Sequence, residues 1–166
     1  VGPAFLFGIV AGAFEDPLIG WQLWGFQILG ALVTAWLFPG SPGVAAPKQG
    51  KTQGDMLTLA VLTMGKICVT VILFRVVLCY GAKYLPVEGT AGVLLGGLLE
   101  LTNGCCSLKE VPAMLRKSVA GGLMALGGIC VLSQTKEVAE GLSLKYYFWG
   151  KGIQALVCIL GGFLKF

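Results

Sequence analysis

The segment Gly-Gly-Leu-Leu-Glu-Leu-Thr-Asn-Gly at residues 96–104 places a single carboxylate, Glu100, inside an apolar and glycine-rich run. An ionised glutamate in hydrocarbon costs several kcal/mol, so such a side chain usually faces a partner or a water-filled cavity. A second glycine-rich apolar run ends in Ser133 and Gln134. Together the two runs predict a polar site at membrane depth.

Composition predicts an integral membrane protein. The chain is 56% hydrophobic and 12% charged, with a mean hydropathy of +0.84, whereas soluble domains are about 25% charged. Each span needs about 20 apolar residues, which leaves room for about five spans. We therefore expect an all-α fold: a polytopic integral membrane helix bundle of about five spans in the lipid bilayer, with broken or re-entrant helices near the midplane.

Several kinds of site have little support in the sequence. The chain has no His and no Cys-x-x-Cys spacing, so we expect neither a metal site nor a cofactor, and we interpret its cysteines as reduced thiols. The lysines are scattered and form no basic stripe with interleaved aromatics, which argues against nucleic acid as a partner. An enzyme is not expected, because there is no nucleophile elbow or phosphate loop and only one carboxylate clearly at membrane depth.

A polar loop divides the chain. Residues 1–38 hold a short apolar run, Pro3–Phe14, interpreted as a half-helix, and then a span at Leu18–Phe38. Residues 39–55 are rich in Pro, Gly, Ser, Gln and Lys, a composition typical of a flexible solvated loop. Residues 56–166 form the remaining bundle, with expected spans at Met56–Tyr80, Val87–Gly104, Ala113–Gln134 and Tyr146–Phe166.

The Val87–Gly104 segment is barely long enough to span and is rich in Gly and Thr, which predicts a broken or re-entrant helix. Non-helical backbone at membrane depth must be buried in protein or line a watery cavity, which agrees with a glutamate in the same segment. We expect the helix-breaking residues to be Gly97, Gly104, Gly127 and Gly128.

Two basic residues lie in the Met56–Tyr80 segment, Lys66 near its middle and Arg75 near its far end. Arg75 is expected to snorkel to the membrane interface. Two interpretations of Lys66 stay open. Its side chain reaches the headgroups or bonds backbone carbonyls, or its charge pairs with Glu100 or with an anionic substrate.

The sequences Gly-Leu-Leu-Glu-Leu-Thr-Asn-Gly at 97–104 and Leu-Gly-Gly-Ile-Cys-Val-Leu-Ser-Gln at 126–134 resemble two motifs of the sporulation integral membrane protein family YlbJ, also called SpoVV. In that family the motifs read Gly-Leu-Leu-Glu-x-Thr-x-Gly and Phe-Gly-Gly-Leu-Ser-x-x-x-Gln. Leu126 and Cys130 depart from the pattern, which usually has Phe and Ser there. The resemblance runs over nearly all of this chain but covers only the C-terminal half of the family.

The resemblance implies that residues 56–166 form a Gate-like transmembrane bundle, because the family carries a nucleoside-recognition or Gate domain twice. Family members resemble concentrative nucleoside transporters and are implicated in passing dipicolinate across the outer forespore membrane of endospore-forming bacteria. The expected location is that membrane or the cell membrane. A missing N-terminal half, a second copy or another membrane subunit is the implied partner, which agrees with a chain that opens at Val1 as if within a longer protein.

The leading hypothesis is a transporter or permease component that moves a small polar or anionic metabolite. Secondary transporters form such sites near the midplane, where discontinuous helices expose their ends. The alternative is a non-transporting membrane scaffold or assembly partner in spore formation, in which the polar residues only lock helices together. The candidate substrate-binding residues are Glu100, Thr102, Asn103, Ser133, Gln134 and Lys66.

Overall fold

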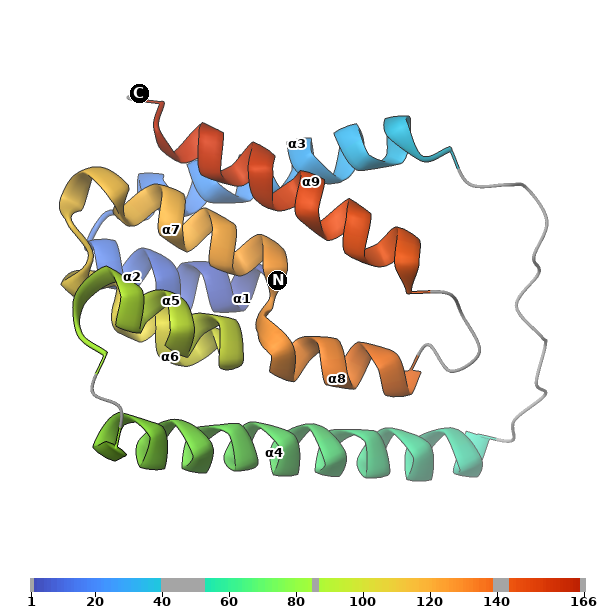
Figure 1. The fold of residues 1–166 in the computed structure, drawn as a ribbon. Coiled ribbons are helices and arrows are strands. Elements are labelled where there is room, and N and C mark those ends of the chain that lie inside the picture. Colours follow the sequence, from blue (N-terminus) through green and yellow to red (C-terminus); the bar gives the residue numbers. More distant parts are fainter. Residues whose placement is uncertain (1, 40–52, 85–86, 139–143, 165–166) are drawn as a thin grey trace.

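The computed structural model describes residues 2–39, 53–84, 87–138 and 144–164. Within these ranges every regular element is a helix, so the described fold is all-α, as predicted (Figure 1). The centre of the bundle consists of α3 (Pro17–Leu37), α7 (Ala113–Leu126) and α9 (Lys145–Gly162), which pack against one another.

A short apolar helix precedes α3. It ends at Glu15, whose φ of 58° is left-handed. The Asp16 side chain then accepts a hydrogen bond from the Leu18 N–H at 2.9 Å and caps α3, while Pro17 occupies the first turn, where its missing N–H costs nothing. This helix comprises α1 (Pro3–Phe5), the π-helical turn η1 (Leu6–Val10) and α2 (Ala11–Phe14).

Small residues bring α7, α9 and α3 together. A Cβ built on Gly121 would lie 3.0 Å from the Cys158 carbonyl oxygen, and one built on Gly30 would lie 3.2 Å from the Gln154 Cα. The absence of side chains at these positions lets the helices approach closely, which is the common packing mode of helices in membranes. Lys117 on α7 also joins the three helices at one end of the bundle.

The Lys117 side chain makes two contacts there. Its Nζ donates to Gln22 Oε1 on α3 at 3.0 Å and to the Leu164 carbonyl just beyond α9 at 3.3 Å. A lysine at the carboxyl end of a helix satisfies carbonyls that lack a partner within the helix.

A helical hairpin formed by α5 (Gly89–Leu99) and α6 (Leu101–Cys106) packs beside this bundle. A Cβ built on Gly97 would lie 3.2 Å from the Gly104 Cα, whereas a continuous helix would hold residues at that spacing about 10 Å apart. The chain therefore reverses at Glu100. The Val87–Gly104 segment is thus folded back on itself and does not form a single crossing helix.

The remaining helices flank the hairpin. The 3-10 turn η2 (Leu108–Glu110) leads into α7, and α8 (Gly128–Val138) follows α7 after a break. Helix α4 (Gln53–Tyr84) lies apart from the bundle, along the hairpin and α8 (Figure 1). From residue 56 to residue 84 its side chains are exposed except for a half-buried stripe at helical spacing, which marks its inner face: Thr63, Ile67, Thr70, Phe74 and Leu78.

Three helical segments are long and apolar enough to cross a membrane: Pro17–Leu37, Met56–Tyr84 and Ala113–Lys136. Pro3–Phe14 and Gly89–Leu99 are shorter apolar helices. Large apolar side chains on the outer surface include Trp36, which is 81% exposed, and Leu57, which is 70% exposed. These features are consistent with a membrane location, while the predicted count of about five spans stays a prediction.

The predicted loop at residues 39–55 is described only at its edges. Residues 40–52 lie outside the described residues, and α4 begins at Gln53, a few residues before the predicted start of the second bundle at residue 56. The polar residues 53–55, which were predicted to belong to the loop, form the first turn of α4.

Replacing Gly104 with Ala tests the hairpin packing. The new Cβ would overlap the Gly97 Cα and approach Leu123 Cδ1 to 3.1 Å, so we expect a loss of about 1–3 kcal/mol, as in other overpacked cores. Thermal denaturation of the purified protein in detergent measures it. Gly65→Ala is the matched control, since a Cβ there meets nothing within 4 Å and Ala favours the helix by up to about 1 kcal/mol. Equal stability of the two variants would contradict the hairpin contact.

Candidate functional site

Glu100 forms the tip of the hairpin. Its backbone is extended, with φ −141° and ψ 116°, and its side chain is buried, with 6% exposure. Its two carboxylate oxygens accept hydrogen bonds from the backbone N–H groups of Thr102 and Asn103, each at 2.8 Å. The carboxylate therefore caps α6, where the first N–H groups of a helix have no partner within the helix.

The tip of the hairpin contacts the break between α7 and α8. Gly127 and Gly128 have φ values of +81° and +75°, a left-handed conformation that glycine adopts without a steric penalty. A Cβ built on Gly128 would lie 3.1 Å from the Gly97 carbonyl oxygen and 3.4 Å from the Leu101 nitrogen. Two interrupted helices thus meet at their interruptions, where α5 and α7 end and α6 and α8 begin.

The expected helix-breaking glycines have two different roles. Gly127 and Gly128 lie at a helix break. Gly97 and Gly104 do not, because they lie inside α5 and α6, and the interruption between those helices falls at Glu100. The Glu100 carboxylate supplies the cap that allows a new helix to start, while Gly97 and Gly104 allow the two arms of the hairpin to touch.

The hairpin brings together some of the predicted site residues. Glu100, Thr102 and Asn103 lie within one turn, and Asn103 Oδ1 accepts a hydrogen bond from the Arg75 guanidinium of α4. The Arg75 guanidinium thus contacts the hairpin, and its expected position at the membrane interface stays a prediction. The sequence feature that marks Arg75 as a candidate site residue is its charge within an apolar run, the same feature that marks Glu100.

The other predicted residues lie elsewhere. In the described part of the chain Gln134 Nε2 donates to the Cys130 Sγ at 3.5 Å and makes no hydrogen bond to Glu100. Ser133 is exposed on α8, and Lys66 is exposed on α4. The structure therefore does not gather all six candidate residues into one cluster.

A groove of about 580 Å³ opens between the end of α4 and the hairpin. Its apolar walls include Leu78, Val93 and Leu99. Polar groups enter it from three segments of the chain: Arg75, Glu88, Asn103, Ser107 and Glu110. Glu100 is not part of the lining, but its carboxylate accepts a hydrogen bond from the backbone N–H of Asn103, which is.

Two side chains in the lining of this groove can form hydrogen bonds with a ligand. The Arg75 guanidinium offers several N–H donors in a planar fork, which suits a carboxylate or a phosphate. The Asn103 amide can both donate and accept. Glu88 and Glu110 add two carboxyl groups to the same lining. A groove with these groups and apolar walls can bind a small polar molecule that also has an apolar or aromatic part, and an anionic group on it has only the Arg75 guanidinium as a charged partner in the lining.

No protein-family model, curated protein or solved structure matches this chain. The resemblance to the YlbJ family therefore stays a prediction that rests on the two motifs at 97–104 and 126–134.

The two glycines of the α7–α8 break should respond differently to Asn, which tolerates left-handed backbone better than most residues. Gly127→Asn should cost about 1 kcal/mol, because a Cβ there makes only ordinary contacts, the nearest at 3.5 Å. Gly128→Asn should cost more, because its Cβ would press on the Gly97 carbonyl. Thermal denaturation in detergent compares the two, and an equal loss would argue against contact between the two helix breaks.

Proposed function

We propose that this chain is a component of a membrane transporter for a small polar or anionic metabolite. The observation that carries the proposal is the buried Glu100 at the tip of a helical hairpin, in contact with the α7–α8 break at Gly128. Paired helix interruptions of this kind form the substrate and ion sites of many secondary transporters. The groove between the end of α4 and the hairpin, here called the Arg75 groove, supplies the binding volume.

The proposed membrane arrangement follows from helix lengths. Helices α3, α4, the α7–α8 pair and α9 cross the bilayer, and the α5–α6 hairpin enters and leaves on one side. Helix α5 has 11 residues, a length of about 16 Å at 1.5 Å per residue. That length is about half of the roughly 30 Å hydrocarbon core, so Glu100 lies near the midplane. This gives four crossings and one re-entrant hairpin in place of five crossings.

The proposed substrate is a small anion, with dipicolinate suggested by the family resemblance. Two ring carboxylates suit the Arg75 guanidinium, and the ring suits the apolar walls of the groove. The volume of about 580 Å³ lies within the range of small-molecule sites, about 300–1,000 Å³. Alternating access would move the hairpin against the α7–α8 break.

The second candidate is a membrane scaffold in spore formation. The observation that favours it is that both Glu100 oxygens already accept backbone hydrogen bonds, so the carboxylate has a structural role without any ligand. Saturable binding of dipicolinate or a nucleoside to the purified chain separates the two functions, because a scaffold has no reason to bind either.

The proposed transporter needs a second set of spans. Inverted-repeat transporters build the site between two halves, and this chain supplies one hairpin and one broken helix among its described residues. A second copy, another membrane subunit or a further N-terminal part of the same protein would supply the other half. The proposed location is the cell membrane or the outer forespore membrane.

Glu100→Gln tests the proposed site by its effect on flux. An amide has one oxygen acceptor where the carboxylate has two, so one buried N–H loses its partner at a cost of about 1–3 kcal/mol. Because the tip of the hairpin would be held less firmly, we expect dipicolinate flux in proteoliposomes to fall. Unchanged flux in a variant that still folds would remove Glu100 from the transport site.

The matched control is Glu15→Gln. Glu15 makes an exposed ion pair with Lys109 at 3.1 Å, and exposed pairs contribute little to stability. Flux should therefore stay at the level of the unmodified protein, and a loss equal to that of Glu100→Gln would indicate a general effect of removing negative charge.

Arg75→Gln tests the substrate class. Loss of the guanidinium removes a charged hydrogen-bond donor worth about 1.5–3 kcal/mol, so dipicolinate should bind about tenfold or more weakly, while uridine should bind unchanged. Isothermal titration calorimetry measures the dissociation constants of both ligands. The control is Lys83→Gln, an equal charge change in the last turn of α4 at a residue that does not line the groove. Equal weakening of the two ligands by Arg75→Gln would contradict an anion-selective groove.

A further inference from the structure

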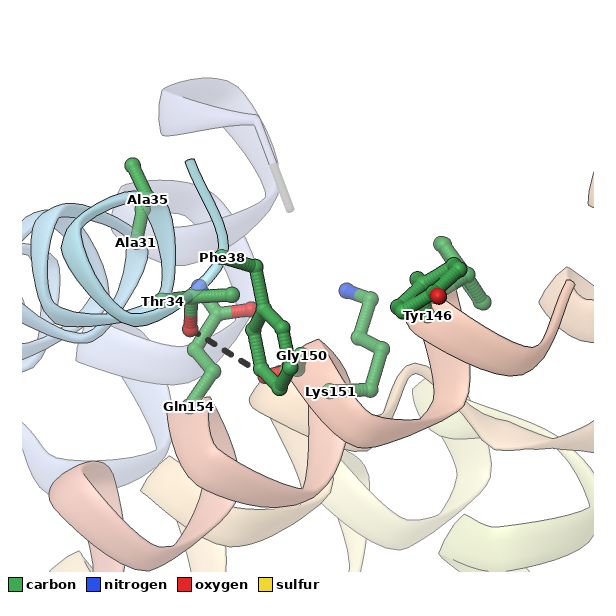
Figure 2. Close-up of a pocket in the computed structure, with 9 residues that line it drawn as sticks. Ala31, Thr34, Ala35, Phe38, Tyr146, Gly150, Lys151 and Gln154 are labelled. Atoms are coloured by element: carbon green, nitrogen blue, oxygen red, sulfur yellow. Dashed lines mark hydrogen bonds between the residues drawn. The ribbon is translucent and has the colours of Figure 1, made fainter. Parts of the chain in front are cut away.

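A second groove, of about 330 Å³, lies between the end of α3 and the start of α9 (Figure 2). Its floor is made of small residues, Ala31 and Ala35 from α3 and Gly150 from α9. Its opening carries larger groups, Phe38, Tyr146 and Lys151. The groove lies away from the hairpin and shares no lining residue with the Arg75 groove.

Close helix contact forms the base of this groove. The Thr34 hydroxyl donates to the Gly30 carbonyl at 2.8 Å, and it lies 3.3 Å from the Gly150 carbonyl of α9, within hydrogen-bond distance. A Cβ built on Gly150 would lie 2.9 Å from Thr34 Cγ2. The two helices therefore touch at this point, and the small side chains beside the contact leave an open groove between them.

The opening combines aromatic rings with a cation. The Phe38 and Tyr146 rings lie edge to face, with their centroids 6.2 Å apart, and Figure 2 shows the Lys151 side chain on the same side of the groove. The Lys151 ammonium lies 5.7 Å from the Tyr147 ring centroid. Aromatic rings and lysines gather at the level of lipid headgroups.

Neighbouring residues also indicate that the opening of the groove lies at the level of the lipid headgroups. Trp36 and Trp149, one on each helix, are 81% and 61% exposed, as expected for side chains in an interfacial aromatic belt. Neither α3 nor α9 contains an acidic residue. The Lys151 charge is therefore not neutralised by a carboxylate on either helix that forms the groove.

We propose that this groove binds one anionic phospholipid. Its phosphate lies at Lys151 and the Tyr146 hydroxyl, and part of one acyl chain lies over Ala31, Ala35 and Gly150. Charge complementarity selects an anionic headgroup, and the apolar floor selects a chain, so the site recognises the whole lipid and not phosphate alone. The inference rests on membrane insertion and is independent of transport.

Native mass spectrometry of the full purified chain in detergent tests the site, with palmitoyl-oleoyl phosphatidylglycerol or palmitoyl-oleoyl phosphatidylcholine added. We expect one tightly bound phosphatidylglycerol and weaker phosphatidylcholine binding. Lys151→Gln should weaken phosphatidylglycerol binding about fivefold, the contribution of one lysine near an anionic surface. Ala35→Leu should weaken both lipids, because it fills the floor at an exposed position where the fold tolerates it.

The matched control is Lys83→Gln. The Lys83 ammonium also lies 5.7 Å from a tyrosine ring, that of Tyr84, but Lys83 does not line this groove. Its removal should leave lipid binding unchanged. Three results would each overturn the proposal. The first is equal binding of the two lipids, and the second is an equal effect of Lys83→Gln and Lys151→Gln. The third is full displacement of phosphatidylglycerol by inorganic phosphate.

Discussion

The hydrogen bonds from the Thr102 and Asn103 N–H groups to the Glu100 carboxylate, each at 2.8 Å, are the interaction on which the rest of this structure depends. Buried N–H groups without partners are costly, and in hydrocarbon no water can supply the missing acceptor. A helix can therefore begin at a buried position only if the protein supplies its own acceptor. Glu100 does so, and this allows α5 to end and α6 to start in the opposite direction.

The reversal at Glu100 determines the contacts around it. It brings Gly97 against Gly104, and it exposes the Gly97 carbonyl at the tip of the hairpin, where Gly128 lies 3.1 Å away when measured from a built Cβ. The left-handed glycines of the α7–α8 break provide a surface without side chains for this contact. The two helix interruptions are therefore complementary in shape, and each leaves space for the other.

The sequence predicted the helical class, the interrupted character of the 87–104 segment and a break at Gly127 and Gly128, because apolar runs and glycine clusters are local signals. It did not predict which residue interrupts the first helix. Glycine usually marks a break, but Gly97 and Gly104 serve close packing, and a glutamate is an uncommon helix cap. The Gln134 amide donates to Cys130 Sγ and the Glu100 carboxylate accepts from Thr102 and Asn103, since a local backbone partner was available to the carboxylate.

The sequence could not predict which basic side chain of α4 contacts the hairpin, because apolar residues lie on all sides of this helix. A helix with a polar face has a preferred rotation against its neighbours, whereas an apolar one leaves its rotation to packing. Arg75 contacts the hairpin as a result. Asn103 is thereby held twice, through its N–H by Glu100 and through its side chain by α4. A carboxylate ligand that took the Arg75 guanidinium would release the second of these contacts and keep the first. The hairpin would then remain folded while its attachment to α4 changed.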